Sequence, residues 1–255
     1  MNSTSKRMVS SRVWSGSYCL LFLVLWACGG SQVGSSTPPG SNPPPNSNPP
    51  PGSPTHPYTT TFHNTENPLS ESGIWINGAA QGIDWSDCRS TPGLGFGTEP
   101  QSVDFNDTTC VMAGTWKATQ QAQGTVRVVT SDSATFEEVE IRLRTTISAH
   151  SITGYEFNCS VKSGSQYMQI VRWNGALGDF TILKGDSLNG CADGDVIKAT
   201  ISGATITAYK NGTQMLQYTD PSPWNSGTPG LGLYVHGGAI ADNSDFGFSS
   251  FTASD

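Results

Sequence analysis

Apolar and polar side chains alternate with a period of two along residues 194–218, GDVIKATISGATITAYKNGTQMLQY. β-Branched residues are frequent in this stretch, which is typical of strands that turn one face toward a core. Ser202-Gly203 and Asn211-Gly212 interrupt the alternation, and the Asn-Gly pair favours the type I′ turn of a hairpin. The stretch therefore predicts three short antiparallel strands in series.

Similar alternation recurs along the chain from residue 59 to residue 253. The further predicted strands are 59–62, 73–77, 116–130, 136–145, 154–161, 166–173, 180–184, 230–236 and 245–253. Residues 78–110 are rich in Gly, Pro, Asp and Thr, and we expect loops at one rim there. About a dozen strands, separated by frequent turn signals and without a convincing amphipathic helix, are typical of a β-sandwich.

The predicted strand 136–145, FEEVEIRLRT, carries the pattern that is most informative for chemistry. Alternation places Val139, Ile141 and Leu143 on one face of this strand. The opposite face then carries two carboxylates and two guanidinium groups, from Glu138, Glu140, Arg142 and Arg144. This polar face is the first candidate for a binding or catalytic surface.

Several segments resemble one known fold family. The pattern G-D-x-I-x-A-x-I-S-G-x-x-I-T-A-Y-x-N-G in residues 194–212 resembles the late strands of concanavalin A-like lectin and glucanase jelly rolls. The segments TTFHNTENPLSESGIW, EIRLRTT, GYEF and SDFGFSSFTA are similar to small bacterial concanavalin A-like or laminin-G-like extracellular domains. The resemblance implies an all-β, two-sheet antiparallel jelly-roll β-sandwich whose last strand lies beside the first. It leaves the activity open, because this fold hosts lectins, glycosidases, lyases and adhesion modules.

Composition divides the chain into three parts. Residues 1–28 are predicted to be a signal peptide, with a basic start and an apolar core at 18–27. The segment LWAC at its end resembles a lipobox, in which Cys28 would be the lipidated residue. Ordinary secretory cleavage and a retained anchor are the alternatives. Residues 29–57 are rich in Pro, Ser, Gly and Asn and predict an extended, disordered linker. Residues 58–255 form the predicted β-sandwich domain.

Charge excludes some classes of partner. Three of the 13 basic residues lie within residues 1–28 and all 20 acidic residues follow, so the remaining chain has ten basic groups against 20 acidic ones, a net charge of −10. Without a Lys or Arg cluster, nucleic acids and anionic membrane surfaces are poor partners. Contact with a membrane is expected through the lipid anchor alone, at the bacterial cell envelope or the outer membrane surface.

Four cysteines follow the leader, and an even number in an exported protein favours disulfides. Three pairings are compatible with the sequence. We favour Cys88–Cys110, which closes the long irregular loop, and Cys159–Cys191, which ties a strand to a loop.

The catalytic motifs of two enzyme classes of this fold are met only in part by this sequence. Retaining glycosidases carry E-x-D-x-x-E on one strand, but only Glu138 and Glu140 correspond here, and arginines replace the third acid. Jelly-roll lyases use an Arg to neutralise a uronate and a His or Tyr to remove a proton. Residues that strand parity could bring together for this are Arg142, Arg144, Asn158, Gln169, Tyr234 and His236. The motifs R-T-E-x-R and Q-I-H are replaced by E-I-R-L-R and Q-I-V, which weakens the lyase hypothesis.

Binding of a glycan needs only an aromatic platform and a few hydrogen-bonding groups. The predicted ligand-binding residues are Trp85, Trp173, Trp224, Tyr234, Glu140, Arg144 and Asn158. Each Trp could instead pack over an edge of the sandwich, and Trp75 is expected in the core. The resemblance also implies a structural calcium ion near both ends of the domain, at Asn64 and Asp245, with turn capping as the alternative.

The sequence thus predicts an exported protein that binds an extracellular glycan on a β-sandwich without catalysis. A polysaccharide lyase or glycoside hydrolase is the first alternative. An envelope adhesion or structural module is the second alternative.

Overall fold

The computed structural model describes residues 56–100, 102–130, 136–237 and 243–255. Cys28, the leader and nearly all of the predicted linker lie outside the described residues. None of the helices in the described part of the chain has the length and apolar character that a bilayer-spanning segment needs.

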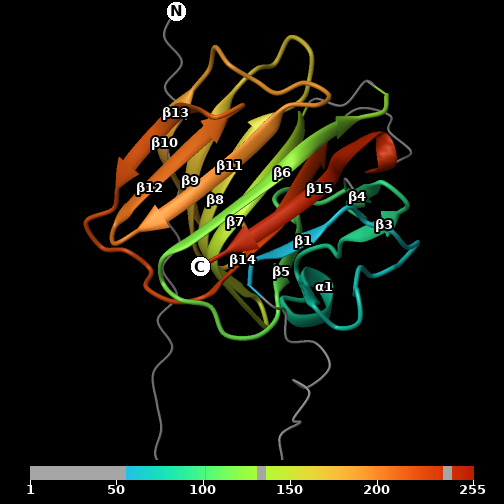
Figure 1. Ribbon diagram of the computed structural model, residues 1–255, viewed down its shortest axis with the longest axis horizontal. Coiled ribbons are helices and arrows are strands. Elements are labelled where there is room, and N and C mark those ends of the chain that lie inside the picture. Colours follow the sequence, from blue (N-terminus) through green and yellow to red (C-terminus); the bar gives the residue numbers. More distant parts are fainter. Residues whose placement is uncertain (1–55, 101, 131–135, 238–242) are drawn as a thin grey trace, which may run out of the picture. The chain divides into compact units, whose positions relative to one another are not determined.

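Two antiparallel sheets are stacked on one another (Figure 1). The first sheet has eight strands in the order β13 (Thr213–Thr219), β12 (Thr205–Lys210), β11 (Val196–Ser202), β6 (Gln120–Val128), β15 (Phe246–Ser254), β4 (Leu94–Phe96) and β3 (Arg89–Thr91), with β1 (Tyr58–Thr60) also paired to β15. The second has seven strands in the order β10 (Phe180–Asp186), β9 (Met168–Gly175), β8 (Ser151–Ser160), β7 (Phe136–Ser148), β14 (Thr228–His236), β5 (Thr108–Met112) and β2 (Trp75–Asn77). The single-turn helix α1 (Gly78–Gln81) follows β2, and the 3₁₀ helix η1 (Asn243–Asp245) precedes β15.

The alternating stretch 194–218 forms β11, β12 and β13 as predicted, and these strands pair in sequence at the edge of the eight-stranded sheet. The turn between β12 and β13 has positive φ at both central residues, 51° at Asn211 and 78° at Gly212. These angles are those that a type I′ turn requires. The last strand β15 pairs with the first strand β1, as the resemblance implied.

Residues 78–110, predicted to be rich in loops, also contain short elements that the sequence did not indicate. This segment contains α1, both strands of the β3–β4 hairpin and the beginning of β5. The three-residue strands β3 and β4 are too short for alternation to show in the sequence. Between β3 and β4, Gly93 has a φ of 82°, which favours glycine at that turn.

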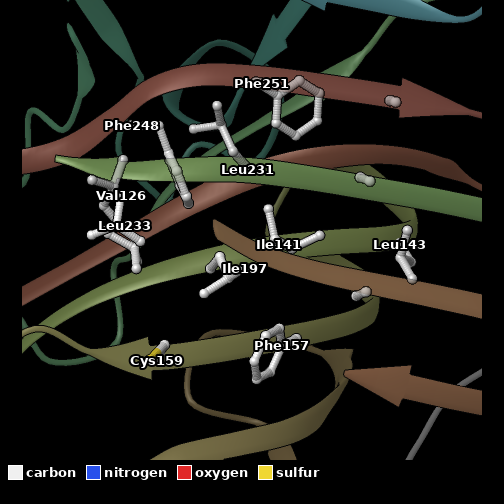
Figure 2. Packing of buried hydrophobic residues seen from close by; sticks show 14 of the residues in the cluster. Val126, Ile141, Leu143, Phe157, Cys159, Ile197, Leu231, Leu233, Phe248 and Phe251 are labelled. Carbon is white, nitrogen blue, oxygen red and sulfur yellow. The ribbon is translucent and has the colours of Figure 1, made fainter. Parts of the chain in front are cut away.

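The core lies between the two sheets. Inward residues of β7, including Val139, Ile141 and Leu143, are at most 1% exposed. They belong to one apolar cluster with Phe248 and Phe251 of β15 (Figure 2). The ring of Phe248 lies over Gly124 of β6, where a Cβ atom would collide with it. The alternation of β7 therefore faces the partner sheet as the sequence predicted, and Trp75 is buried as expected.

Both predicted disulfides are confirmed. Cys88 precedes β3 and is bonded to Cys110 in β5, and so joins the two sheets. Cys159 in β8 is bonded to Cys191 in the loop before β11. Disulfides form and persist in oxidising compartments, which indicates an extracytoplasmic protein.

We expect replacement of Phe248 by Ala to lower the free energy of unfolding by about 3–5 kcal/mol, because it removes a fully buried ring and leaves a cavity. The exposed Leu188 provides the control, and Leu188→Ala should change stability by less than about 0.5 kcal/mol. Urea unfolding of both variants measures the difference. Equal stability of the two variants would contradict the assigned core.

Candidate functional site

The candidate site lies on the outer face of the seven-stranded sheet, opposite to its core face. Glu138, Glu140 and Arg142 alternate with the core residues of β7 and therefore project to this face. Gly232 of β14 pairs with Glu140 in the neighbouring strand. A Cβ atom at Gly232 would overlap the Glu140 carboxylate and lie 2.8 Å from Nε of Arg142. Glycine at this position therefore makes room for two charged side chains.

The guanidinium of Arg142 lies among three carboxylates. Nη2 is 3.1 Å from Oδ2 of Asp107 and also contacts Oε2 of Glu140. Nη1 is 3.3 Å from Oε2 of Glu156, which comes from the adjacent strand β8. The Arg142 side chain is 0% exposed, and burial without these partners would be very unfavourable.

Oxygens of Asp107, Glu140 and Glu156 lie within 4.8 Å of one another, a spacing that a metal ion could use. The Arg142 guanidinium contacts all three carboxylates and supplies the positive charge there. In this arrangement the three carboxylates hold an arginine.

Side chains of β8 and β9 surround Glu156. Nε1 of Trp173 donates to Oε2 of Glu156 at 2.7 Å, and Nδ2 of Asn158 donates to Oε1 at 2.9 Å. The same Nδ2 is 3.3 Å from Oε1 of Gln169. The position of the Trp173 ring and the orientation of the Asn158 amide are thus fixed by hydrogen bonds.

Burial and the repulsion of nearby acids raise the pKa values of Glu99, Asp107, Glu138 and Glu140. Burial, followed by the charge of Glu156, raises the pKa of Glu138 to about 8, although the Tyr167 hydroxyl donates to this carboxylate. Burial raises the pKa of Asp107 to about 7 against the opposing effect of Arg142. For Glu99, burial and the charge of Asp107 raise the pKa to about 9. The pKa of Glu140 lies well above its usual value, again because of burial.

A groove runs over this acidic cluster. Its inner pocket, of about 80 Å³, is lined by Phe105, Asp107, Glu138, Glu156, Asn158, Gln169, Val171, Trp173, Phe180 and Tyr234. The inner pocket is continuous in its lining with an outer cavity of about 610 Å³, to which Asp104, Phe136, Gln166, Tyr167, Ile182, Ser187 and His236 also contribute. The groove therefore combines an acidic floor with aromatic walls.

Phe105 closes one end of the groove. It lies in the loop before β5, yet its ring centroid is 5.4 Å from that of Phe180 in β10, which four strands separate from β5 in the sheet. Glu99 fixes the beginning of the same loop, because its Oε2 accepts from the Val235 N–H at 2.8 Å. Phe180 in turn packs against Trp173 at 5.4 Å. These contacts make a continuous aromatic wall over the floor.

Six residues that the sequence singled out line the groove, and Glu138 lines both of its parts. Asn158, Gln169, Trp173 and Tyr234 line the inner pocket, and His236 lines the outer cavity. Nε2 of His236 is 2.9 Å from Oδ1 of Asp104, a partner that lies too far away in sequence to be predicted. Glu140 and Arg142 lie beneath the floor, both at most 1% exposed, and line neither part of the groove.

Arg144 does not lie on this face, which corrects the predicted strand parity. A register shift between Leu143 and Thr146 marks a β-bulge, and Arg144 has a φ of 48°. Its guanidinium donates to three backbone carbonyls, of Ala118, Trp224 and Gly203. Arg144 therefore ties loops together and is not directed to a ligand.

Trp85 and Trp224 pack against other residues of the domain and do not form an aromatic platform in the groove. Trp85 is 3% exposed and packs edge-on against Trp173 at 6.0 Å, beneath the groove. Nε1 of Trp224 donates to the Trp173 carbonyl, and its ring covers the Arg172 guanidinium at 4.8 Å. Neither of the two lines the groove.

The two positions suggested for calcium have backbone roles in turns. The carbonyl of Asn64 accepts from the Ser90 hydroxyl at 2.7 Å, and the carbonyl of Asp245 accepts from the Val129 and Thr130 N–H groups. Calcium binding at Asn64 and Asp245 stays a prediction.

Sequence reasoning missed several groove residues. Glu156 lies two positions before Asn158 in the same strand, so strand parity could have identified it. Phe105, Asp107 and Glu99 come from an irregular loop, where no periodicity indicates which side chains turn toward the sheet.

No protein-family model matches the chain, and no curated protein matches it either. Among solved structures it is similar to a mutant form of the GH43 protein BlXynB from Bacillus licheniformis, with a TM-score of 0.52 and 14% identity over 76% of this chain and 38% of that chain. It is also similar to the carbohydrate binding module CBM66 from Bacillus subtilis, with a TM-score of 0.47 and 11% identity over 73% and 94% of the two chains. It is similar, too, to the carbohydrate recognition domain of Emp46p, with a TM-score of 0.49 and 9% identity over 78% of this chain and 99% of that chain. At such identities the likeness establishes the fold alone, a jelly-roll β-sandwich of two antiparallel sheets.

We expect stability to fall as the pH rises from about 5 to 9. In the unfolded chain Glu99, Asp107 and Glu138 ionise near pH 4, whereas their pKa values in the fold are about 9, 7 and 8. Their contribution to stability is fully present below the unfolded pKa and is lost as the pH rises through the folded values. Thermal unfolding at several pH values should show a Tm that falls from about pH 5 and levels off near pH 9.

The Glu99→Gln variant tests the source of this slope. Its amide oxygen can still accept from Val235, but the side chain no longer titrates. Its Tm should fall less with rising pH than that of the wild type. A flat wild-type profile, or an unchanged slope in the variant, would contradict the assignment.

Proposed function

We propose that the protein binds a glycan, without catalysis, in the groove on the outer face of the seven-stranded sheet. The observation that carries this proposal is an aromatic-walled groove whose floor presents hydrogen-bonding groups. Sugar rings stack on aromatic faces through their C–H groups, and their hydroxyls need such acceptors and donors. The outer cavity of about 610 Å³ is of the size that small-ligand sites have.

The contacts of Arg142 and Arg144 favour glycan binding and speak against a lyase reaction. A lyase needs a guanidinium that can neutralise the substrate carboxylate. Arg142 is surrounded by three carboxylates, and Arg144 is bonded to backbone carbonyls. An incoming uronate would therefore meet carboxylates without a free cation.

A glycoside hydrolase is the second candidate, because one observation favours it. Glu138 lines the inner pocket with a pKa of about 8, which would keep it protonated as a general acid near neutral pH. Asp107 and Glu156 line the same pocket and are the candidates for the second carboxylate. Against this candidate, Arg142 holds both of these partners.

We further propose that the protein acts outside the cytoplasm as a lipoprotein. The lipobox-like LWAC segment supports attachment of lipid at Cys28. Residues 29–57 would then serve as a stalk that holds the domain away from the membrane. The two disulfides are consistent with this location.

We expect Tyr234→Ala and Phe180→Ala to weaken binding of a retained polysaccharide by about tenfold or more each, because both remove an aromatic wall of the groove. Affinity electrophoresis in gels with xylan, β-glucan, galactomannan or glycol chitosan identifies the polysaccharide, and calorimetry then measures the variants. The matched control is Tyr209→Ala, which removes an aromatic ring from β12 of the opposite sheet.

Retardation in none of the gels, or equal losses for Tyr209→Ala and Tyr234→Ala, would contradict the groove as a glycan site. New reducing ends in the retained polysaccharide, absent with Glu138→Gln, would favour the hydrolase instead.

We expect Cys28→Ala to release the protein from the membrane fraction of a bacterial host that processes lipoproteins. The reason is that Cys28 would carry the acyl chains. Metabolic labelling with a radioactive fatty acid measures acylation directly. The control is Cys19→Ala, within the apolar part of the leader. Label that persists in Cys28→Ala would refute acylation at this residue.

A further inference from the structure

We propose that the inner pocket takes a positively charged group of the ligand, the ammonium group of an amino sugar. The inference rests on the proposed glycan-binding function and names the class of glycan. Its starting point is an imbalance between hydrogen-bond acceptors and donors in this part of the groove. Three carboxylates line the inner pocket, from Asp107, Glu138 and Glu156.

A buried acceptor points to a ligand that donates. Asn158 lines the inner pocket and is 4% exposed, and its Oδ1 has no hydrogen-bond partner. Oε1 of Glu156 and Oε1 of Gln169 accept from its Nδ2, which fixes the orientation of the amide. An unpaired buried acceptor is unfavourable, so a ligand N–H group at this position would restore the lost bond.

The walls of the same pocket suit a cation. Phe105, Trp173, Phe180 and Tyr234 surround the acidic floor. The faces of aromatic rings attract cations, and cages of such rings bind ammonium groups in proteins. With about 80 Å³, the inner pocket has room for a substituent of a few atoms, while the sugar ring would lie in the outer cavity.

No competing positive charge is available at the groove. Among the described residues that line its two parts there is neither Lys nor Arg. Arg142 lies beneath the floor at 0% exposure and is held by carboxylates. The pocket therefore offers its negative charge to a ligand.

Cation binding is coupled to proton release from Glu138. The charged and titratable groups that face this side chain are Glu99, Asp107, Glu140, Arg142, Glu156, Tyr167 and Tyr234. Most of them are acids that favour the protonated form of Glu138, whose pKa is about 8. An ammonium group nearby favours the ionised form, so Glu138 would lose its proton as the ligand binds.

The test compares two tetrasaccharides on the same scaffold by calorimetry at about pH 5.5, where an amino sugar carries an ammonium group both free and bound. One is the tetramer of β-1,4-linked glucosamine, whose ammonium groups can donate to Oδ1 of Asn158, and the other is the neutral N-acetylated tetramer. We expect the charged tetramer to bind at least about tenfold more tightly and to release protons, seen as an enthalpy that depends on the ionisation enthalpy of the buffer.

Two variants locate the effect. Glu138→Gln keeps the shape and the acceptor for Tyr167, and it should abolish proton release and the preference for the charged tetramer. Phe105→Leu changes a ring that is 40% exposed, so it should fold, and it should weaken binding of the charged tetramer more than that of the neutral one. Asp193→Asn is the control, because this carboxylate pairs with Arg127 on the other sheet.

Equal binding of both tetramers without proton release would overturn the inference and leave the groove as a site for neutral glycans. Failure of both tetramers to bind would also overturn it, while the polysaccharide gels decide separately whether the groove binds a glycan. A preference that survives in Glu138→Gln would refute the role of this carboxylate.

Discussion

The buried Arg142 guanidinium is the interaction on which the outer face of the seven-stranded sheet depends. A charge at 0% exposure is tolerated only with close, opposite partners, and Asp107, Glu140 and Glu156 supply them from a loop and two strands. Gly232 leaves the space for this cluster between β7 and β14. Burial first, and then the excess of carboxylates over the one cation, raises the pKa values of Glu138 and Glu140.

The same strand builds the core and the groove. Val139 and Ile141 of β7 pack between the sheets, whereas Glu138 and Glu140 project from its other face. Displacement of a floor residue would therefore disturb a closely packed core, which makes the floor rigid. Loops supply the Phe105 side of the groove and also Gln166, Tyr167 and Ser187 of the outer cavity. The strands therefore fix most of the inner pocket, and the loops shape its opening.

Alternation and turn residues predicted most of the sandwich, because both depend on neighbours in sequence. They succeeded for β7, for the Asn211-Gly212 hairpin and for the outward position of Asn158. They failed at Arg144, because a bulge reverses the parity of a strand without a clear sign in the sequence. The acidic cluster was out of reach for another reason, since it joins Asp107 to Arg142 across 35 positions through tertiary structure.

The charges on the seven-stranded sheet are not a requirement of the fold. The opposite sheet has the same strand geometry, but its outer face carries neutral pairs such as Thr205–Thr219, Thr59–Thr252 and Gln121–Ser254. Such pairs satisfy hydrogen bonds without desolvating charge. Clustered, buried carboxylates destabilise the fold as the pH rises, so sheet stability alone does not explain them. Groups that weaken a fold and line a groove are typical of a site maintained for binding, and this contrast between the two faces favours a functional role for the acidic one.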